Sequence, residues 1–166
     1  MKRLLICRHA KSSWKDLSLT DRDRPLNKRG KRDAPMMGKR LHRRGISPDA
    51  VITSPARRAA KTAGHLAKAV HFSTTHIQVV DSLYGASPSS IIELLRTVDD
   101  SLATVMVVGH NPECTMLANF LGGLHIDNVP TCGVVALDFH ITHWQHVKKG
   151  EGKLVFYDYP KKDPAP

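Results

Sequence analysis

Arginine and histidine side chains occur where short apolar runs of the chain end. Arg8 and His9 follow one such run, and His110 follows another. Apolar runs that alternate with longer amphipathic stretches are typical of βα units. Because open α/β sheets bind ligands at the carboxyl ends of their strands, we expect these three side chains to face one pocket.

A third apolar run ends in Ser54-Pro55-Ala56-Arg57-Arg58. A serine followed by proline is a helix start signal, which places Arg57 in the first turn of a helix. The unpaired N–H groups and the positive end of the dipole at such a helix start favour a phosphate dianion. The pocket is therefore expected to bind phosphate.

Two histidines and two arginines suit phosphoryl transfer without a metal or an organic cofactor. A neutral imidazole can attack phosphorus while planar guanidinium groups hold the equatorial oxygens. We expect His9 to be the nucleophile because Arg8 adjoins it at the same strand end, and His110 to donate to the phosphate.

Several blocks of the chain, in order, are similar to the SixA-type phosphohistidine phosphatases of the histidine phosphatase superfamily. The similarity runs from Leu4 to about Tyr157. It rests on the segments Leu5–Trp14, Asp23–Gly30, Ser54–Thr62, Leu83–Ser87, Val108–Pro112 and Pro130–Val134.

This resemblance implies which residues form the phosphate pocket and that one of them is transiently phosphorylated. Arg24, in the Arg-Pro-Leu block, matches an arginine that faces the pocket and binds substrate. Arg58 competes with Arg57, but the family's Ser-Pro-x-Arg spacing selects Arg57. The implied catalytic set is Arg8, His9, Arg57 and His110, with His9 carrying the phosphoryl group.

Phosphomonoesterases of the superfamily usually carry a carboxylate after the third strand, where it protonates the leaving oxygen. Here the loop 82–88 contains none, and Asp81 only precedes it. A phosphohistidine needs less help from an acid, so the sequence favours P–N over P–O cleavage. A small-molecule phosphomonoesterase that uses Asp81 as its acid is the alternative.

The basic excess of the chain is confined to its first part. The formal net charge is +10, of which residues 1–45 carry +11 and the remainder −1. A basic nucleic-acid-binding module is a third hypothesis, although no recognition motif supports it. We expect instead that the basic segment attracts an acidic phosphorylated partner, either a phosphohistidine protein or a small substrate.

The remaining signals are compatible with a cytoplasmic enzyme. Three widely spaced cysteines offer no disulfide framework, and no apolar window is long enough for a signal peptide or a membrane span. His140, His143 and His146 are spaced by three, which on a strand points them to opposite faces and argues against a shared metal.

The alternation of apolar runs and amphipathic stretches that positions these residues predicts a single α/β domain. We expect three layers, with helices flanking a mainly parallel sheet and an antiparallel hairpin at the C-terminus, joined by the short turn 148–152. The family resemblance implies a phosphoglycerate mutase-like fold over residues 1–160, with 161–166 as a frayed tail. Pro35 predicts a late start or a kink in the first helix, and 11–25 reads as a flap.

Overall fold

The computed structural model describes residues 1–162, which form one α/β domain around a six-stranded mixed sheet. The strand order is β3-β2-β4-β1-β5-β6, and only β5 runs against the other strands. The strands are β1 (Lys2–Arg8), β2 (Ala50–Thr53), β3 (Gln78–Val79), β4 (Thr104–Gly109), β5 (Val134–Phe139) and β6 (Lys153–Asp158).

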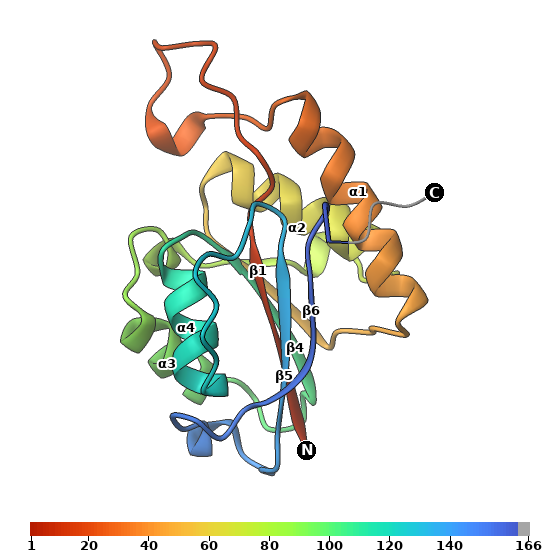
Figure 1. The fold of residues 1–166 in the computed structure, drawn as a ribbon, viewed down its shortest axis with the longest axis vertical. Helices are drawn as coiled ribbons and strands as arrows, with labels where there is room; N and C mark the ends of the chain where they lie inside the picture. The colour runs from red at the N-terminus through yellow and green to blue at the C-terminus, as the bar shows by residue number, and fades with distance from the viewer. Residues whose placement is uncertain (163–166) are drawn as a thin grey trace.

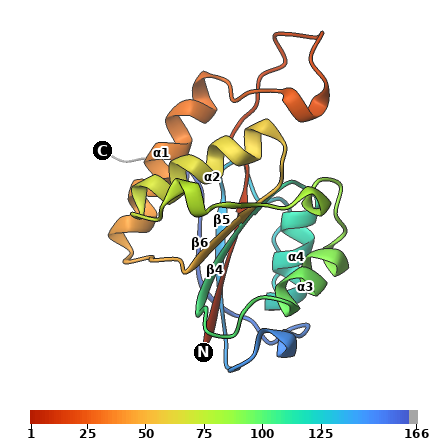
Figure 2. The same cartoon turned by 180° about the vertical axis from the view of Figure 1, so that it is seen from behind.

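Helices cover both faces of this sheet, which confirms the predicted three layers. Helices α1 and α2 lie on one side, and α3 and α4 lie on the other, as the two opposite views show (Figures 1 and 2). The helices are α1 (Lys28–Arg43), α2 (Arg57–Ala69), α3 (Pro88–Arg96) and α4 (Glu113–Gly122).

Strand β1 is buried on both faces, so its sequence reads as a continuous apolar run. Leu4 and Ile6 pack into the core beneath α3 and α4, whereas Leu5 and Cys7 pack beneath α1 and α2. Successive side chains of a strand point to opposite faces, and a parallel strand covered on both sides needs apolar residues throughout. The core thereby fixes the strand whose end carries Arg8.

Two helix starts differ from the sequence prediction. Helix α1 begins at Lys28, capped by the Asn27 side chain, and continues through Pro35 without a late start. Helix α2 begins at Arg57 rather than directly after Ser54. Helix α4 begins at Glu113, after a cis peptide bond between Asn111 and Pro112.

The predicted antiparallel hairpin at the C-terminus is present, but its connection is longer than expected. Strands β5 and β6 pair antiparallel. The chain between them includes a 3₁₀ turn at Trp144–His146, with Trp144 fully buried, so 148–152 is not the whole connection. Of the predicted tail, Lys162 closes a turn onto Tyr159, and 163–166 lie outside the described residues.

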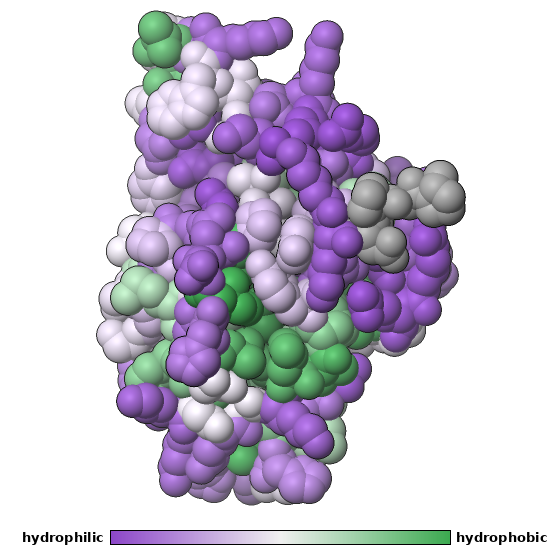
Figure 3. Space-filling model, viewed as in Figure 1, coloured by the Kyte–Doolittle hydropathy of each residue, from purple (hydrophilic) through white to green (hydrophobic). Residues whose placement is uncertain are grey.

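The segment 11–25 forms a flap that extends beyond the carboxyl end of β1 (Figure 1). An isolated bridge between Ser12 and Leu26 closes its base, and a 3₁₀ turn at Asp21–Asp23 lies within it. Hydrophilic surface dominates α1, the outer end of the flap carries a small apolar patch, and a larger apolar area gathers where β6 crosses the middle of the molecule (Figure 3). Within residues 1–162, every helix is too short or too polar to span a bilayer.

Gly30 is expected to be sensitive to substitution because α1 packs directly on the chain that leaves β1. A Cβ at Gly30 would collide with the carbonyl oxygen of Lys11. We predict that Gly30→Ala lowers the free energy of unfolding by ~1–3 kcal/mol, which urea denaturation would measure.

Gly64, inside α2, supplies the matched control because a Cβ there meets nothing within 4 Å. Gly64→Ala should raise the free energy of unfolding by up to ~1 kcal/mol, since alanine is the better helix former. Equal stability of Gly30→Ala and wild type would contradict this packing.

Candidate active site

The parallel pairing of β1 with β4 brings the two predicted histidines together. Arg8 pairs in register with Gly109, and the backbone N–H of His9 donates to the Gly109 carbonyl at 3.0 Å. His9 directly follows the last residue of β1, and His110 directly follows the last residue of β4. The centroids of the two imidazole rings lie 5.2 Å apart. A cavity of about 350 Å³ opens there, lined by Arg8, both histidines and six further residues.

The hydrogen bonding of His9 leaves one ring nitrogen available. Its Nδ1 lies 2.7 Å from the carbonyl oxygen of Ala10, so Nδ1 carries the hydrogen and donates. Burial, reinforced by the neighbouring cations of Arg58 and Arg8, lowers the pKa of His9 to about 3. At neutral pH His9 is therefore a neutral imidazole with an unprotonated Nε2, the form that can act as a nucleophile.

Arg8 lines the same cavity and also contains a buried donor without a partner. Its Nη1 donates to the Val129 carbonyl at 2.9 Å, but its Nε is buried and has no hydrogen-bond partner among the described residues. Burial also lowers the pKa of Arg8 from its ordinary value, although the guanidinium stays charged. A partly desolvated cation beside the cavity favours a phosphate dianion.

The structure places Arg58, not the predicted Arg57, in the cavity. Arg58 is 7% exposed and lines the cavity, whereas Arg57 is exposed and does not line it. The Arg58 guanidinium donates from Nη1 to the Asp21 carbonyl at 2.6 Å and from Nη2 to the Asp21 carboxylate at 3.0 Å. The prediction that Arg57 lines the phosphate pocket is therefore wrong, because Arg58 occupies that place.

Helical periodicity gives the reason for the correction. The buried side chains of α2 include Arg58, Thr62 and Leu66, spaced by four, so they share one face of the helix. Arg57 is rotated by about 100° from that face. Thr62 Oγ1 also accepts from the Ala10 N–H at 2.9 Å, which ties this face to the residue after His9. The four-residue spacing of Arg58, Thr62 and Leu66 in the sequence could therefore have identified Arg58 as the inward-facing arginine.

His110 is held by two partners. Arg58 Nη2 lies 3.5 Å from its Nδ1, and its Nε2 lies 2.7 Å from Ser54 Oγ. Because arginine can only donate, Nδ1 accepts and Nε2 carries the hydrogen. Burial, together with the charge of Arg58, lowers the pKa of His110 to about 4. Both histidines of the cavity are thus neutral before substrate arrives.

Arg24 does not line the cavity, contrary to the prediction. Its side chain is 8% exposed and lies inside the flap, where it donates to the Ser13 carbonyl at 3.1 Å and the Asp21 carboxylate at 2.9 Å. Its guanidinium also stacks 3.2 Å from the ring centroid of Trp14. Arg24 therefore organises the flap and reaches the cavity only through Asp21.

Sequence reasoning missed four cavity-lining side chains: Asp21, Tyr84, Asn111 and Glu113. The Tyr84 hydroxyl donates to Asp21 Oδ2 at 2.5 Å, and its ring meets His110 edge-on at 5.7 Å. Glu113 forms no hydrogen bond or ion pair within residues 1–162. Asp81, the predicted alternative acid, is 85% exposed, pairs with Arg22 at 3.4 Å and lies outside the cavity.

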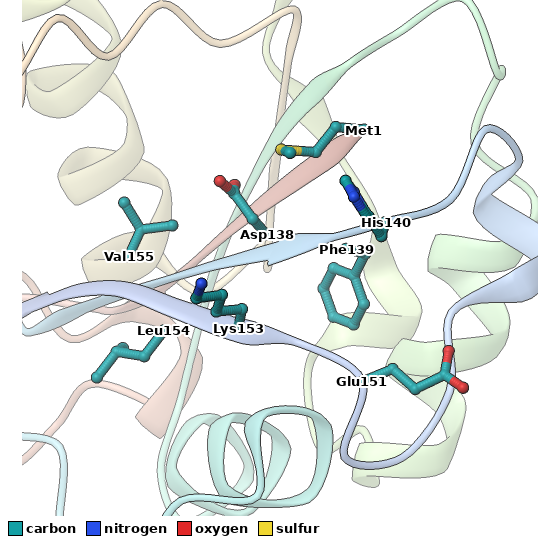
Figure 4. Close-up of a pocket in the computed structure, with 8 residues that line it drawn as sticks. All are labelled: Met1, Asp138, Phe139, His140, Glu151, Lys153, Leu154 and Val155. Atoms are coloured by element: carbon teal, nitrogen blue, oxygen red, sulfur yellow. The ribbon is translucent and has the colours of Figure 1, made fainter.

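A larger cavity, of about 570 Å³, lies elsewhere on the sheet (Figure 4). It is lined by Met1, which precedes β1, and by residues of β5 and β6 such as Phe139 and Leu154, and its lining includes one histidine, His140, and no arginine. Within the part of the chain that is described, no three His, Cys, Asp or Glu side chains are grouped to hold a metal ion. The cavity that contains His9, His110 and the two arginines is therefore the smaller one, of about 350 Å³.

A mixed α/β sheet with two histidines and Arg8 at the carboxyl ends of its central strands, and Arg58 beside them, is the arrangement expected of a phosphatase. The comparison with protein families agrees, because residues 4–84 match the Histidine phosphatase superfamily (branch 1). An uncharacterized protein of Mycobacterium tuberculosis is 34% identical over 164 residues, covering 93% of this chain and 99% of that protein. The chain belongs to the histidine phosphatase superfamily.

Solved structures place the chain beside SixA proteins. The SixA protein of Agrobacterium tumefaciens has 25% identity and a TM-score of 0.79, over 96% of this chain and 98% of that one. The protein histidine phosphatase SixA in complex with tungstate has 19% identity and a TM-score of 0.81, over 95% and 97% of the two chains. A mycobacterial glucosyl-3-phosphoglycerate phosphatase follows at 15% identity and a TM-score of 0.66, over 95% and 99%. The predicted phosphoglycerate mutase-like fold is confirmed.

The two adjacent arginines of α2 give a matched pair of variants. We predict that Arg58→Ala lowers kcat/KM for a phosphorylated substrate by ~10²–10³-fold, the usual effect of removing one donor to a developing charge. Steady-state kinetics would measure it.

Arg57→Ala removes the same side chain one position away, on the exposed face. It should change kcat/KM by less than about two-fold, as a surface substitution of ~0.5 kcal/mol does. A larger loss in Arg57→Ala than in Arg58→Ala would reverse the assignment.

Proposed function

We propose that this protein hydrolyses the phosphoryl group of protein phosphohistidine through a covalent phospho-His9 intermediate. The observation that carries the proposal is the state of His9, whose Nδ1–H is fixed on Ala10 and whose neutral Nε2 lines a cavity shared with Arg8 and Arg58. Nucleophilic catalysis needs an unprotonated nucleophile beside fixed cations, and this cavity supplies both.

In the first half-reaction, His9 Nε2 forms a bond to phosphorus while the bond from phosphorus to the substrate nitrogen breaks. The electron pair of that bond leaves with the substrate imidazole. The guanidinium groups of Arg8 and Arg58, which both line the cavity, hold the equatorial oxygens and stabilise their charge. His110 completes the pocket beside His9.

In the second half-reaction, water attacks the phosphorus of phospho-His9 and the P–N bond to Nε2 breaks. Inorganic phosphate leaves, and His9 returns to its neutral form. The Ala10 carbonyl keeps Nδ1 protonated throughout, so the departing group is a neutral imidazole rather than an imidazolate.

The position of Asp81 supports phosphohistidine over phosphate esters. Its carboxylate lies outside the cavity, and the neighbouring chain contributes Tyr84 and Gly85 to the cavity instead. An alkoxide leaving group needs a proton donor, whereas an imidazole that is already protonated on its second nitrogen does not.

The charge distribution supports an acidic partner and, with the absence of a disulfide framework, a cytoplasmic location. Helix α1 exposes Lys28, Lys31, Arg32, Lys39 and Arg43. A surface of one sign attracts an oppositely charged protein and speeds its encounter with the enzyme.

A small-molecule phosphomonoesterase is the second candidate, and one observation favours it. Glu113 lines the cavity and pairs with no other side chain within residues 1–162, so it could supply the proton that Asp81 cannot. Esters of small metabolites would then be substrates.

The deciding experiment compares a phosphohistidine protein with an aryl phosphate ester at matched concentrations. We expect release of phosphate from both, a higher kcat/KM for phosphohistidine, and loss of both activities in His9→Ala. A coupled enzymatic assay that detects free phosphate at neutral pH is the readout, because acidic reagents hydrolyse phosphohistidine without enzyme, and Glu113→Gln is the variant that separates the candidates.

If the ester is the better substrate and Glu113→Gln slows it selectively, the phosphomonoesterase account replaces the first. If His9→Ala retains activity on phosphohistidine, the covalent mechanism is wrong.

A further inference from the structure

The Asp21 carboxylate lines the cavity but has no part in the transfer steps above. It projects from the flap and meets groups from three separate segments of the chain. Arg24 Nη1 donates to Oδ1 at 2.9 Å, and Arg58 Nη2 donates to Oδ2 at 3.0 Å. The Tyr84 hydroxyl donates to Oδ2 at 2.5 Å. The flap therefore places a negative charge beside the phosphate pocket.

A carboxylate offers about four acceptor positions, two on each oxygen. The contacts of Asp21 fill two on Oδ2 and one on Oδ1, which leaves one on Oδ1. The side chain is 49% exposed and lines the cavity, so a bound molecule can reach the carboxylate. Asp21 can accept one further hydrogen bond from a bound molecule.

Asp21 cannot act as the proton donor for a leaving group. Hydrogen bonding from Tyr84, together with the charges of Arg58 and Arg24, holds its pKa well below the usual range. It remains an anion at every pH at which an enzyme of this class would work. Its chemistry is that of a hydrogen-bond acceptor for an N–H or O–H donor.

The substrate assigned under the proposed function carries a matching donor. Phosphohistidine bears its phosphoryl group on one ring nitrogen, and when the ring is protonated the other nitrogen carries an N–H. Breaking the P–N bond sends the electron pair to the first nitrogen while the proton stays on the second. The ring then leaves as a neutral imidazole, and no other acid is needed.

We propose that Asp21 accepts a hydrogen bond from the distal N–H of the phosphohistidine ring and so selects an imidazole leaving group. The inference rests on the proposed function and names the residue that gives the site its preference. The Tyr84 ring, which stands beside Asp21 and is 36% exposed, provides an aromatic wall for the imidazole. Phenols and simple alcohols carry no second ring N–H and gain nothing from this carboxylate.

Asp21 also holds Arg58, so its removal affects every substrate to some extent. The informative quantity is therefore the ratio of kcat/KM for a phosphohistidine peptide to kcat/KM for p-nitrophenyl phosphate. A role limited to positioning Arg58 would lower both values equally and leave the ratio unchanged. If Asp21 binds the imidazole N–H, its removal lowers the ratio, because only the phosphohistidine peptide loses that hydrogen bond.

The experiment measures this ratio in wild type, Asp21→Asn, Asp21→Glu and Asp81→Asn. We expect Asp21→Asn to lower the ratio about 10- to 100-fold, the value of a hydrogen bond to a charged group. Asp21→Glu retains the carboxylate and should restore part of the ratio. Asp81→Asn makes the same chemical change outside the cavity and should leave the ratio at the wild-type value.

The outcomes separate this inference from the function on which it rests. Wild type that does not hydrolyse the phosphohistidine peptide overturns the proposed function. Wild type that hydrolyses it, with an unchanged ratio in a folded Asp21→Asn, overturns the role of Asp21 alone. Thermal unfolding of each variant establishes that it is folded, and Asp21→Glu provides the comparison if the asparagine variant is unstable.

Discussion

The site depends on the parallel register between β1 and β4. Pairing Arg8 with Gly109 places the residues that follow, His9 and His110, side by side at one edge of the sheet. A shift of one residue would exchange the two faces of β1 and bring side chains of different size and shape against each helical layer, so the close packing of the core enforces the register. Core packing of the sheet therefore determines where the two histidines lie.

Burial then determines the chemical state of the cluster. The same packing that excludes water from His9 lowers its pKa to about 3 and leaves it neutral. It also leaves Arg8 Nε without a partner within residues 1–162. A neutral nucleophile beside two partly desolvated cations, Arg8 and Arg58, favours a phosphate dianion, because the ligand restores the charge balance.

Most of the fold and three cavity residues could be predicted from sequence, because apolar runs mark where strands end and so locate Arg8, His9 and His110. The error at Arg57 came from following the family's Ser-Pro-x-Arg spacing, whereas the four-residue spacing of Arg58, Thr62 and Leu66 puts Arg58 on the buried face of α2. Asp21 could not be predicted, since the flap has no periodicity and Asp21's contacts with Arg58 and Tyr84 span 37 and 63 residues. Arg24 resembled a pocket residue but serves the flap that carries Asp21.

The central claim is that His9 becomes the phosphoryl carrier. The most direct measurement is rapid acid-free quenching of the enzyme during turnover, followed by mass spectrometric mapping of the phosphorylated peptide. The account predicts a phosphoryl group on His9 that is stable in alkali and labile in acid. A phosphoryl group on His110, or turnover without any phosphorylated enzyme, would contradict it.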